Sequence, residues 1–250
     1  MMSTTAAAFY DRMRVLMDHM VQSQEAEIAT AGNLLAVAIR GGGMVHAFGS
    51  GHSEALAMEL AARAGGLIPS NRIAFRDLVI FGGMPVEAVH SDKIERDPSV
   101  ARALYDLGAP APGDVVVIAS NSGINGTVIE FARLVRDGGC PLIAITSRAH
   151  SMREPSRHPS GAKLLDIADV VLDNGAPHGD AVVEVGGVVA CGVSSITSAT
   201  LAQLIVGTAI DRLVEDGIEP PVYLSANIAD GDEHNNAWES RYAGRLRRSA

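Results

Sequence analysis

Residues 113–139 have the sequence GDVVVIASNSGINGTVIEFARLVRDGG. Positions 115–118 form a short β-branched apolar run, typical of a strand buried on both faces of a parallel sheet. Seven residues with hydroxyls, amides and two glycines follow at 120–126, and apolar residues then recur at helical spacing until Gly138. Small polar groups between a strand and the amino end of a helix favour an anion. The stretch therefore predicts a phosphate-binding loop; the alternative is a turn whose Ser and Asn side chains only cap the helix.

A second unit of the same kind lies earlier in the chain. The apolar run 44–48, MVHAF, leads directly into 49–53, GSGHS, and apolar residues at helical spacing follow over 56–64. The loop contains neither the Gly-Lys-Ser/Thr of a Walker loop nor a G-x-G-x-x-G dinucleotide fingerprint. Because ligands of open α/β sheets bind where the strands end, two such loops are expected to converge on one site.

The pair GSGHS and SNSGIN, each leaving a strand, resembles the sugar isomerase (SIS) domain of phosphosugar isomerases, lyases and sugar-phosphate sensors. The runs at 156–161, 170–181 and 220–235 are similar to those of an SIS branch with a long N-terminal helix. The resemblance implies an α/β fold, a doubly wound parallel five-stranded sheet flanked by helices in a flavodoxin-like three-layer sandwich. It also implies that loop hydroxyls and amides hold the substrate phosphate, through Ser50, Ser53, Ser120, Asn121, Ser122 and Asn125.

The sequence predicts a single SIS domain over 1–250, with a leading helix within 1–40 and a C-terminal extension at 217–250. Apolar runs predict strands at 44–48, 115–118, 142–147, 170–172 and 182–185, and a buried helix at 195–215. Residues 150–163 are rich in Ser, Pro, Arg and His, which indicates a loop. Residues 68–96 give no clear pattern.

Composition excludes several classes of protein. The 250 residues carry a formal net charge of −9, and the only basic run is at the C-terminus, which argues against nucleic acid as a partner. Polar residues dilute the uncharged stretch 185–210, so it predicts a strand and helix rather than a membrane span; no signal peptide is recognised, and we expect a soluble, cytoplasmic protein. Cys140 and Cys191 are expected to be core thiols, and without metal-ligand spacing no metal or other cofactor is predicted.

Phosphosugar isomerases and lyases need a base to remove a proton beside a carbonyl. Glu59 and Arg63 are one helical turn apart on the predicted helix, and Glu59 corresponds to a Glu of glucosamine-6-phosphate synthase, which it resembles there. The muramic acid 6-phosphate etherase and phosphoheptose isomerase carry their Glu where this chain has Arg63. We predict Glu59 as the base, the alternative being a plain ion pair with Arg63. His52 and His178 are the predicted acid–base partners, with His90 as a further alternative.

The predicted function is an enzyme that removes the C2 proton of an amino-sugar (N-acetylhexosamine) 6-phosphate. Lys93 and Lys163 are the only lysines, so a substrate imine is not expected, and elimination is slightly favoured over aldose–ketose isomerisation. Phosphoheptose isomerase has a His on its late helix where this chain has Gln203. The alternative function is a non-catalytic phosphosugar sensor. The SIS resemblance further implies a homodimer with shared active sites.

Overall fold

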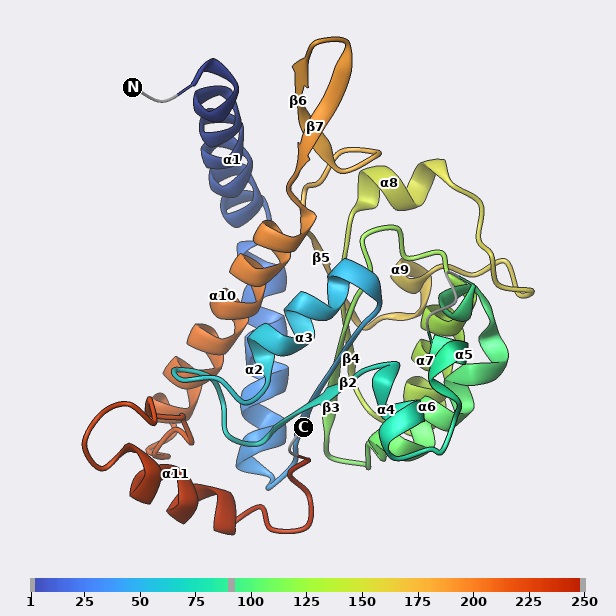
Figure 1. Ribbon diagram of the computed structural model, residues 1–250. Coiled ribbons are helices and arrows are strands. Elements are labelled where there is room, and N and C mark those ends of the chain that lie inside the picture. The colour runs from blue at the N-terminus through green and yellow to red at the C-terminus, as the bar shows by residue number, and fades with distance from the viewer. Residues whose placement is uncertain (1–2, 90–92, 248–250) are drawn as a thin grey trace.

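The sheet at the centre of the fold is parallel and has five strands in the order β2-β1-β3-β4-β5 (Figure 1). The computed structural model describes residues 3–89 and 93–247. This order is that of a doubly wound flavodoxin-like sheet, which confirms the predicted fold class. The strands are β1 Val45–Gly49, β2 Ser70–Ile73, β3 Val115–Ala119, β4 Leu142–Thr146 and β5 Val170–Asp173.

Helices cover both faces of the sheet (Figure 1). One face packs against α2 Glu25–Arg40, α3 Glu54–Leu60 and α10 Ser194–Glu215. The other packs against α4 Arg76–Ile80, α6 Ala101–Gly108, α7 Gly126–Asp137 and α9 Leu164–Ile167. Alternate residues of β3 enter the two cores: Val115 and Val117 face α2 and α10, whereas Val116 and Ile118 face α7. Both faces of the sheet are therefore buried under apolar side chains, as the continuous apolar runs predicted.

The predicted leading helix is divided in two. It consists of α1 Thr4–Ser23 and α2, with a break at Gln24, whose φ is −135°. The Gln24 side chain donates to the carbonyl of Asp173 at 2.8 Å and accepts from the N–H of Asp173 at 2.6 Å. The side-chain amide of Gln24 thus acts as a partner for the end of β5, and the helix changes direction there.

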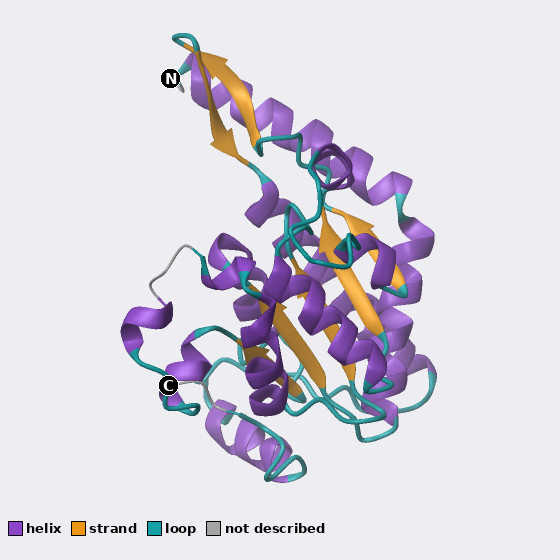
Figure 2. Cartoon of the chain, turned by 90° about the vertical axis from the view of Figure 1, so that its right-hand side faces the viewer, coloured by secondary structure: helices purple, strands orange, loops and turns teal. Residues whose placement is uncertain are grey.

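The predicted strand at 182–185 exists but lies outside the central sheet. It is β6 Ala181–Val185, which pairs antiparallel with β7 Val188–Gly192 across the turn at Gly186 and Gly187. Figure 2 shows this hairpin projecting beside α1, away from the body of the protein. The fifth strand of the sheet is instead β2, which the sequence analysis missed. Its sequence, SNRI, has one large apolar residue, and the buried Asn71 hydrogen-bonds to the backbone of Arg245 and Arg247 in the C-terminal extension.

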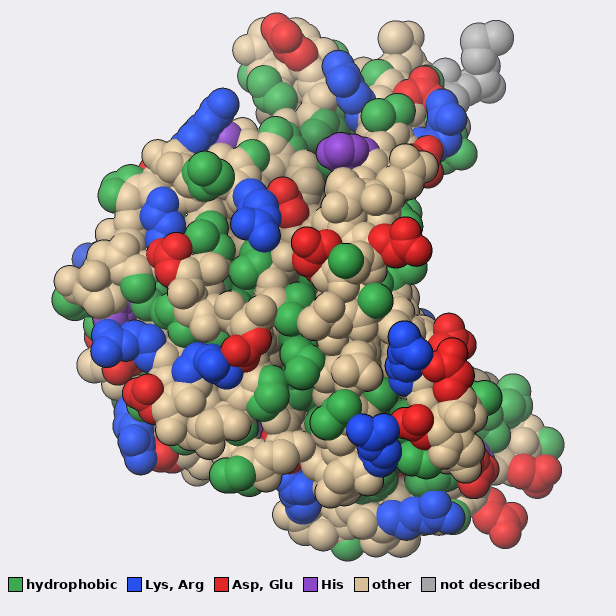
Figure 3. Space-filling model, turned by 180° about the vertical axis from the view of Figure 1, so that it is seen from behind, with side chains coloured by type: hydrophobic (Ala, Val, Ile, Leu, Met, Phe, Trp, Pro, Cys, Tyr) green, Lys and Arg blue, Asp and Glu red, His purple; other side chains and the backbone are tan. Residues whose placement is uncertain are grey.

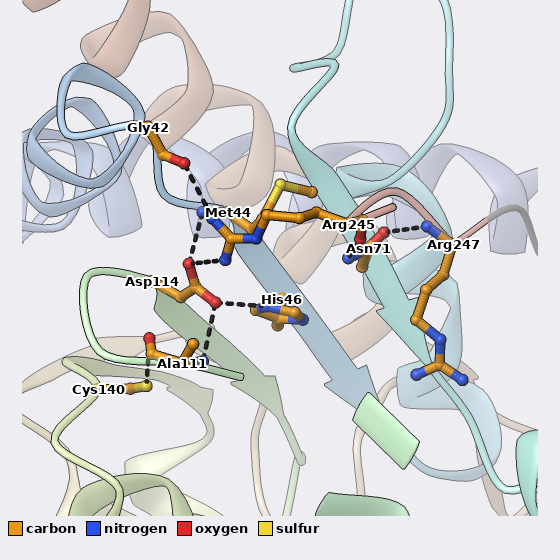
Figure 4. A network of polar contacts seen from close by, with 9 residues as sticks. All are labelled: Gly42, Met44, His46, Asn71, Ala111, Asp114, Cys140, Arg245 and Arg247. Atoms are coloured by element: carbon orange, nitrogen blue, oxygen red, sulfur yellow. Dashed lines mark hydrogen bonds and ion pairs between the residues drawn. The ribbon is translucent and has the colours of Figure 1, made fainter. Parts of the chain in front are cut away.

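The C-terminal extension folds back under the sheet. After an isolated bridge between Leu67 and Val222, α11 Gly231–Ser240 leads to Arg245, whose Nη2 lies 2.6 Å from Oδ1 of Asp114 (Figure 4). Asp114 is fully buried and also accepts from Met44 N and from the ring of His46. This network joins the last turn of the chain to the amino ends of β1 and β3, opposite the edge where the polar loops lie.

Other sequence-based expectations also need correction or qualification. Residues 150–163 are not wholly a loop, because α8 Arg148–Arg153 covers their beginning; α5 Val86–Val89 is a further short helix. Cys140 is buried as expected, but Cys191 is exposed because β7 belongs to the projecting hairpin. Among the described helices, none has the length and apolar character needed to cross a bilayer. Acidic and basic side chains are interspersed on the face seen in Figure 3.

Candidate functional site

The first polar loop is a single tight turn at the carboxyl end of β1. Ser50 is extended, residues 51–53 form a 3₁₀ turn, and Ser53 N donates to the carbonyl of Ser50 at 3.0 Å. Gly49 allows this turn, since a Cβ there would lie 2.2 Å from the carbonyl oxygen of Ser53. The hydroxyls of Ser50 and Ser53 are thereby held at the end of the strand.

The second loop is shaped in the same way at the end of β3. Gly123 has a φ of +63°, and its N–H donates to Oγ of Ser120 at 3.2 Å. Asn125 is extended and precedes α7 without using its side chain as a cap. Its Oδ1 instead accepts from Nη1 of Arg157 at 2.7 Å. A guanidinium therefore lies beside the amino end of a 12-residue helix, and both groups favour an anion.

The two loops meet in one cleft of about 510 Å³. β1 and β3 are neighbours in the sheet, with Gly49 opposite Ala119, so both loops leave the sheet side by side. The segments that follow β4 and β5 also supply residues to the cleft lining. The residues that line the cleft are Ser50, Ser53, Glu95, Ser120, Asn121, Ser122, Ile124, Asn125, His150, Glu154, Arg157 and His178.

Opposite the loops lies a group of two histidines and a carboxylate. Nε2 of His178 is 2.7 Å from Oε1 of Glu154, and the rings of His150 and His178 are 4.8 Å apart between centroids. The hydrogen bond from His178 lowers the pKa of Glu154. Burial and the neighbouring His178 lower the pKa of His150. The arrangement gives a neutral imidazole and an imidazole–carboxylate pair, which is suited to general acid–base chemistry.

Glu95 is a second carboxylate in the cleft, and the sequence analysis did not single it out. It belongs to the 3₁₀ turn Ile94–Arg96, and its Oε2 accepts from Oγ of Ser50 at 3.0 Å. Thr127 at the start of α7 holds this turn by donating to the carbonyls of Ile94 and Asp97. A charged run such as that around Glu95 is typical of a solvated face in sequence, and the contacts with Thr127 and Ser50 hold it over the cleft.

The structure brings most of the predicted site residues together. The cleft is lined by Ser50, Ser53, Ser120, Asn121, Ser122, Asn125 and His178. His52 lies in the same loop but lines two adjoining cavities rather than the cleft itself. Glu154, His150 and Arg157 were not predicted, because they follow β4 in a segment whose composition indicated only a loop. His90 lies outside the described residues.

Glu59 lies on α3, where its side chain is 24% exposed. Oε1 of Glu59 accepts from Nη1 of Arg63, the expected partner one turn later, and from Nε2 of Gln203 on α10 at 2.6 Å. It does not line the cleft. Over residues 3–89 and 93–247, no three His, Cys, Asp or Glu side chains are grouped as ligands of a metal ion would be.

Comparison with known proteins identifies the family of this chain. The family model described as SIS domain matches residues 8–147, more than half of the chain. The chain belongs to the SIS domain family. A UPF0309 protein of Listeria monocytogenes is 38% identical over 95% of this chain and 97% of its own length. A UPF0309 protein of Geobacillus kaustophilus is 33% identical over 95% of this chain and 94% of its own.

Solved structures share the SIS fold. Phosphoheptose isomerase from Neisseria gonorrhoeae superposes with a TM-score of 0.58, at 18% identity, over 82% of this chain and 96% of its own. The sugar isomerase domain of an RpiR transcription factor from Sphaerobacter thermophilus gives 0.52, at 15% identity, over 98% and 100%. At these identities the likeness concerns the fold, and the fold is shared by an enzyme and a regulator.

Proposed function

We propose that this SIS protein is an enzyme that acts on an amino-sugar 6-phosphate, an N-acetylhexosamine 6-phosphate, by removing the proton at C2. The observation that supports the proposal is that one cleft contains both kinds of group that this chemistry needs. Hydroxyls and amides of two strand-end loops face a hydrogen-bonded imidazole–carboxylate pair across the same space. A binding protein needs only the first set.

The phosphate end of the substrate belongs at the second loop. Ser120 and Ser122 supply hydroxyls, α7 supplies the positive end of its dipole, and Arg157 supplies a full charge. A phosphate dianion in this position neutralises the guanidinium beside Asn125. An unphosphorylated sugar would lose these interactions and bind poorly, because hydrogen bonds to a charged group each contribute about 1.5–3 kcal/mol.

The sugar then extends toward the acid–base groups. Abstraction at C2 of the open-chain aldehyde needs a carboxylate or imidazole at some distance from the phosphate, since C2 is four carbons from C6. Glu95 is the carboxylate that we assign as the base within the cleft of one chain, and Glu59 remains the alternative base. His178, oriented by Glu154, is assigned to proton delivery.

The enolate formed by removal of the C2 proton can react in two ways. Reprotonation at C1 gives the ketose, whereas expulsion of the C3 substituent with its electron pair, as a proton is supplied to it, gives elimination. Both lysines lie off α3, so no amine is provided there for an imine. We assign elimination, or dehydration where the leaving group is hydroxide, ahead of isomerisation.

The test is NMR spectroscopy of the purified protein with hexosamine and N-acetylhexosamine 6-phosphates in deuterated water. Deuterium at C2 reports proton abstraction, and a new alkene signal reports elimination. Saturable binding of a phosphosugar with neither exchange nor turnover across the panel would overturn the enzymatic proposal and identify a phosphosugar sensor. No binding of any phosphosugar would overturn both.

A further inference from the structure

The phosphate cleft continues into two adjoining cavities along the edge of the sheet. The first, about 380 Å³, shares Ser53 and Asn121 with the cleft. The second, about 650 Å³, shares His52 and Ser195 with the first. The first cavity therefore adjoins both the cleft and the second cavity, whose lining includes Arg76 and Glu54.

The far cavity lies beside a cluster of cationic side chains. Arg76 begins α4, directly after β2, and its Nη2 contacts Oε1 of Glu54. Arg72 on β2 approaches the same oxygen, with Nη1 at 3.9 Å. Two guanidinium groups thus share one carboxylate. The net charge of the chain is −9, so an excess of positive charge at this edge is a local feature.

The carboxylate of Asp77, also nearby, does not neutralise the excess positive charge of these arginines. Oδ2 of Asp77 accepts from the N–H of Ala74 at 3.0 Å and lies 4.0 Å from Nη2 of a third arginine, Arg247. The cluster therefore contains three guanidinium groups and two carboxylates. Burial is the main cause that lowers the pKa of Arg72, and the charge of Arg76 lowers it further, whereas Glu54 and Asp77 act in the opposite direction.

Hydrogen bonding within the cluster is also incomplete. Nε of Arg72 and Nε of Arg76 are both buried and have no acceptor in the described part of the chain. Unsatisfied buried donors of charged groups are costly, and they leave the guanidinium charge poorly compensated. The Arg76 side chain is 40% exposed, so its guanidinium is accessible from the cavity that it lines.

We propose that the cavity beside Arg76 binds a second anionic group of the substrate, a carboxylate or a second phosphate on the same sugar. The inference rests on the proposed function and specifies its substrate class: a sugar phosphate with two separated negative groups. His52, which lines both adjoining cavities, lies between the two anion sites. Its loop position places it beside the bound sugar rather than at either end.

The experiment is calorimetric titration of the full chain with matched ligand pairs. N-Acetylglucosamine 6-phosphate is compared with the same sugar bearing a carboxylate-containing ether on O3, and glucose 6-phosphate with glucose 1,6-bisphosphate. In at least one pair, the ligand with the second anionic group should bind about 10-fold or more tightly than its partner, which corresponds to about 1.4 kcal/mol. Arg76→Gln should remove this gain and leave the affinity for the singly phosphorylated sugars within about twofold.

The control is Arg102→Gln, which removes an exposed arginine paired with Asp106 on α6. It should keep the gain. If the wild-type protein binds both members of each pair with equal affinity, the inference is overturned and the proposed function stays intact. The same holds if Arg76→Gln still binds the ligand with the second anionic group more tightly than its partner. If no phosphosugar binds at all, the proposed function fails and this inference fails with it.

Discussion

Nε2 of His178 lies 2.7 Å from Oε1 of Glu154, although the two residues come from different strand-end segments, after β5 and after α8. The contact fixes one ring nitrogen of His178 on a carboxylate. The other nitrogen is then the one available to exchange a proton with a substrate. His150, with its pKa lowered by burial and by His178, adds a neutral ring beside the pair.

Replacing Glu154 with Gln should lower turnover because the amide no longer fixes the tautomer of His178. We expect kcat to fall by about 10–100-fold and the dissociation constant for substrate to change little, whereas His178→Asn should cost at least about 100-fold. Steady-state kinetics and calorimetry measure the two effects. Glu215→Gln, which removes an exposed carboxylate paired with Arg212 at the end of α10, is the control. Wild-type kcat in Glu154→Gln would contradict the assigned role of the pair.

The phosphate loop gives a prediction that concerns binding alone. Ser122→Ala removes one hydroxyl from the cleft and should weaken binding of a sugar 6-phosphate by about 1–3 kcal/mol, the range for a hydrogen bond to a charged partner. Ser240→Ala, a hydroxyl bonded to its own helix α11, should have no effect. Calorimetry would refute the assignment if both variants bound as the wild type does.

Asp114 predicts how stability depends on pH. Burial raises its pKa, but hydrogen bonds from His46, from Ala111 N, from Arg245 and from Met44 N outweigh burial and lower the pKa far below its usual range. The carboxylate therefore stabilises the fold above the unfolded value of about 3.9, and this contribution is lost as the pH falls through the folded value.

Accordingly, Asp114→Asn should reduce the free energy of unfolding at pH 7 by about 3–5 kcal/mol, since it leaves Arg245 and the β1 end without their carboxylate. Urea titrations at pH 7 and pH 3 measure the change. The difference between wild type and variant should shrink at the lower pH. A difference that grows toward low pH would show that the linkage has the opposite sign.

The assembly prediction concerns the projecting hairpin. Val188 and Val189 of β7 are 60% and 62% exposed, on a hairpin that projects beside α1 (Figure 2). We expect these valines to be buried in a symmetric homodimer. Light scattering should give a dimer mass for the wild type and a monomer mass for Val189→Glu. Met152→Glu, at another exposed apolar site on α8, should remain dimeric; a monomeric wild type would refute the prediction.

The sequence best predicted the strands that are buried on both faces of the sheet. Runs such as 115–118 carry a strong signal because both faces of β3 are apolar. β2 gave no such signal, since its buried Asn71 is satisfied by the backbone of the C-terminal extension instead of by apolar packing. β6 gave a misleading one because a hairpin rich in valine resembles a strand of the central sheet. The flavodoxin-like arrangement of the strands was implied by the SIS resemblance, not by the runs themselves.

In the candidate site, the two polar loops could be predicted from the sequence, whereas the other residues that line the cleft could not. The hydroxyls of Ser120 and Ser122 directly follow a recognisable strand, so their place at the sheet edge follows from topology. Glu95, Glu154 and Arg157 reach the cleft only through tertiary contacts, such as that of Thr127 with the carbonyl of Ile94. Polar side chains in irregular segments carry no periodicity that would place them in advance.

The last prediction concerns the identity of the base, for which two carboxylates compete. Glu95 lines the cleft and accepts a hydrogen bond from Ser50, whereas Glu59 is held by Arg63 and by Gln203 where α3 meets α10. Glu95→Gln is nearly isosteric and cannot accept a proton. It should lower kcat and the rate of deuterium exchange at C2 by at least about 100-fold while substrate still binds.

Glu59→Gln decides the alternative in the same assay. If Glu95 is the base within each chain, Glu59→Gln should keep kcat within about threefold of the wild type and lose only stability, by about 0.5 kcal/mol or less, as expected for a helix-surface ion pair. If instead Glu59→Gln abolishes exchange and Glu95→Gln does not, the base is Glu59, and the active site must be completed by the face of α3 and α10 where Gln203 meets it.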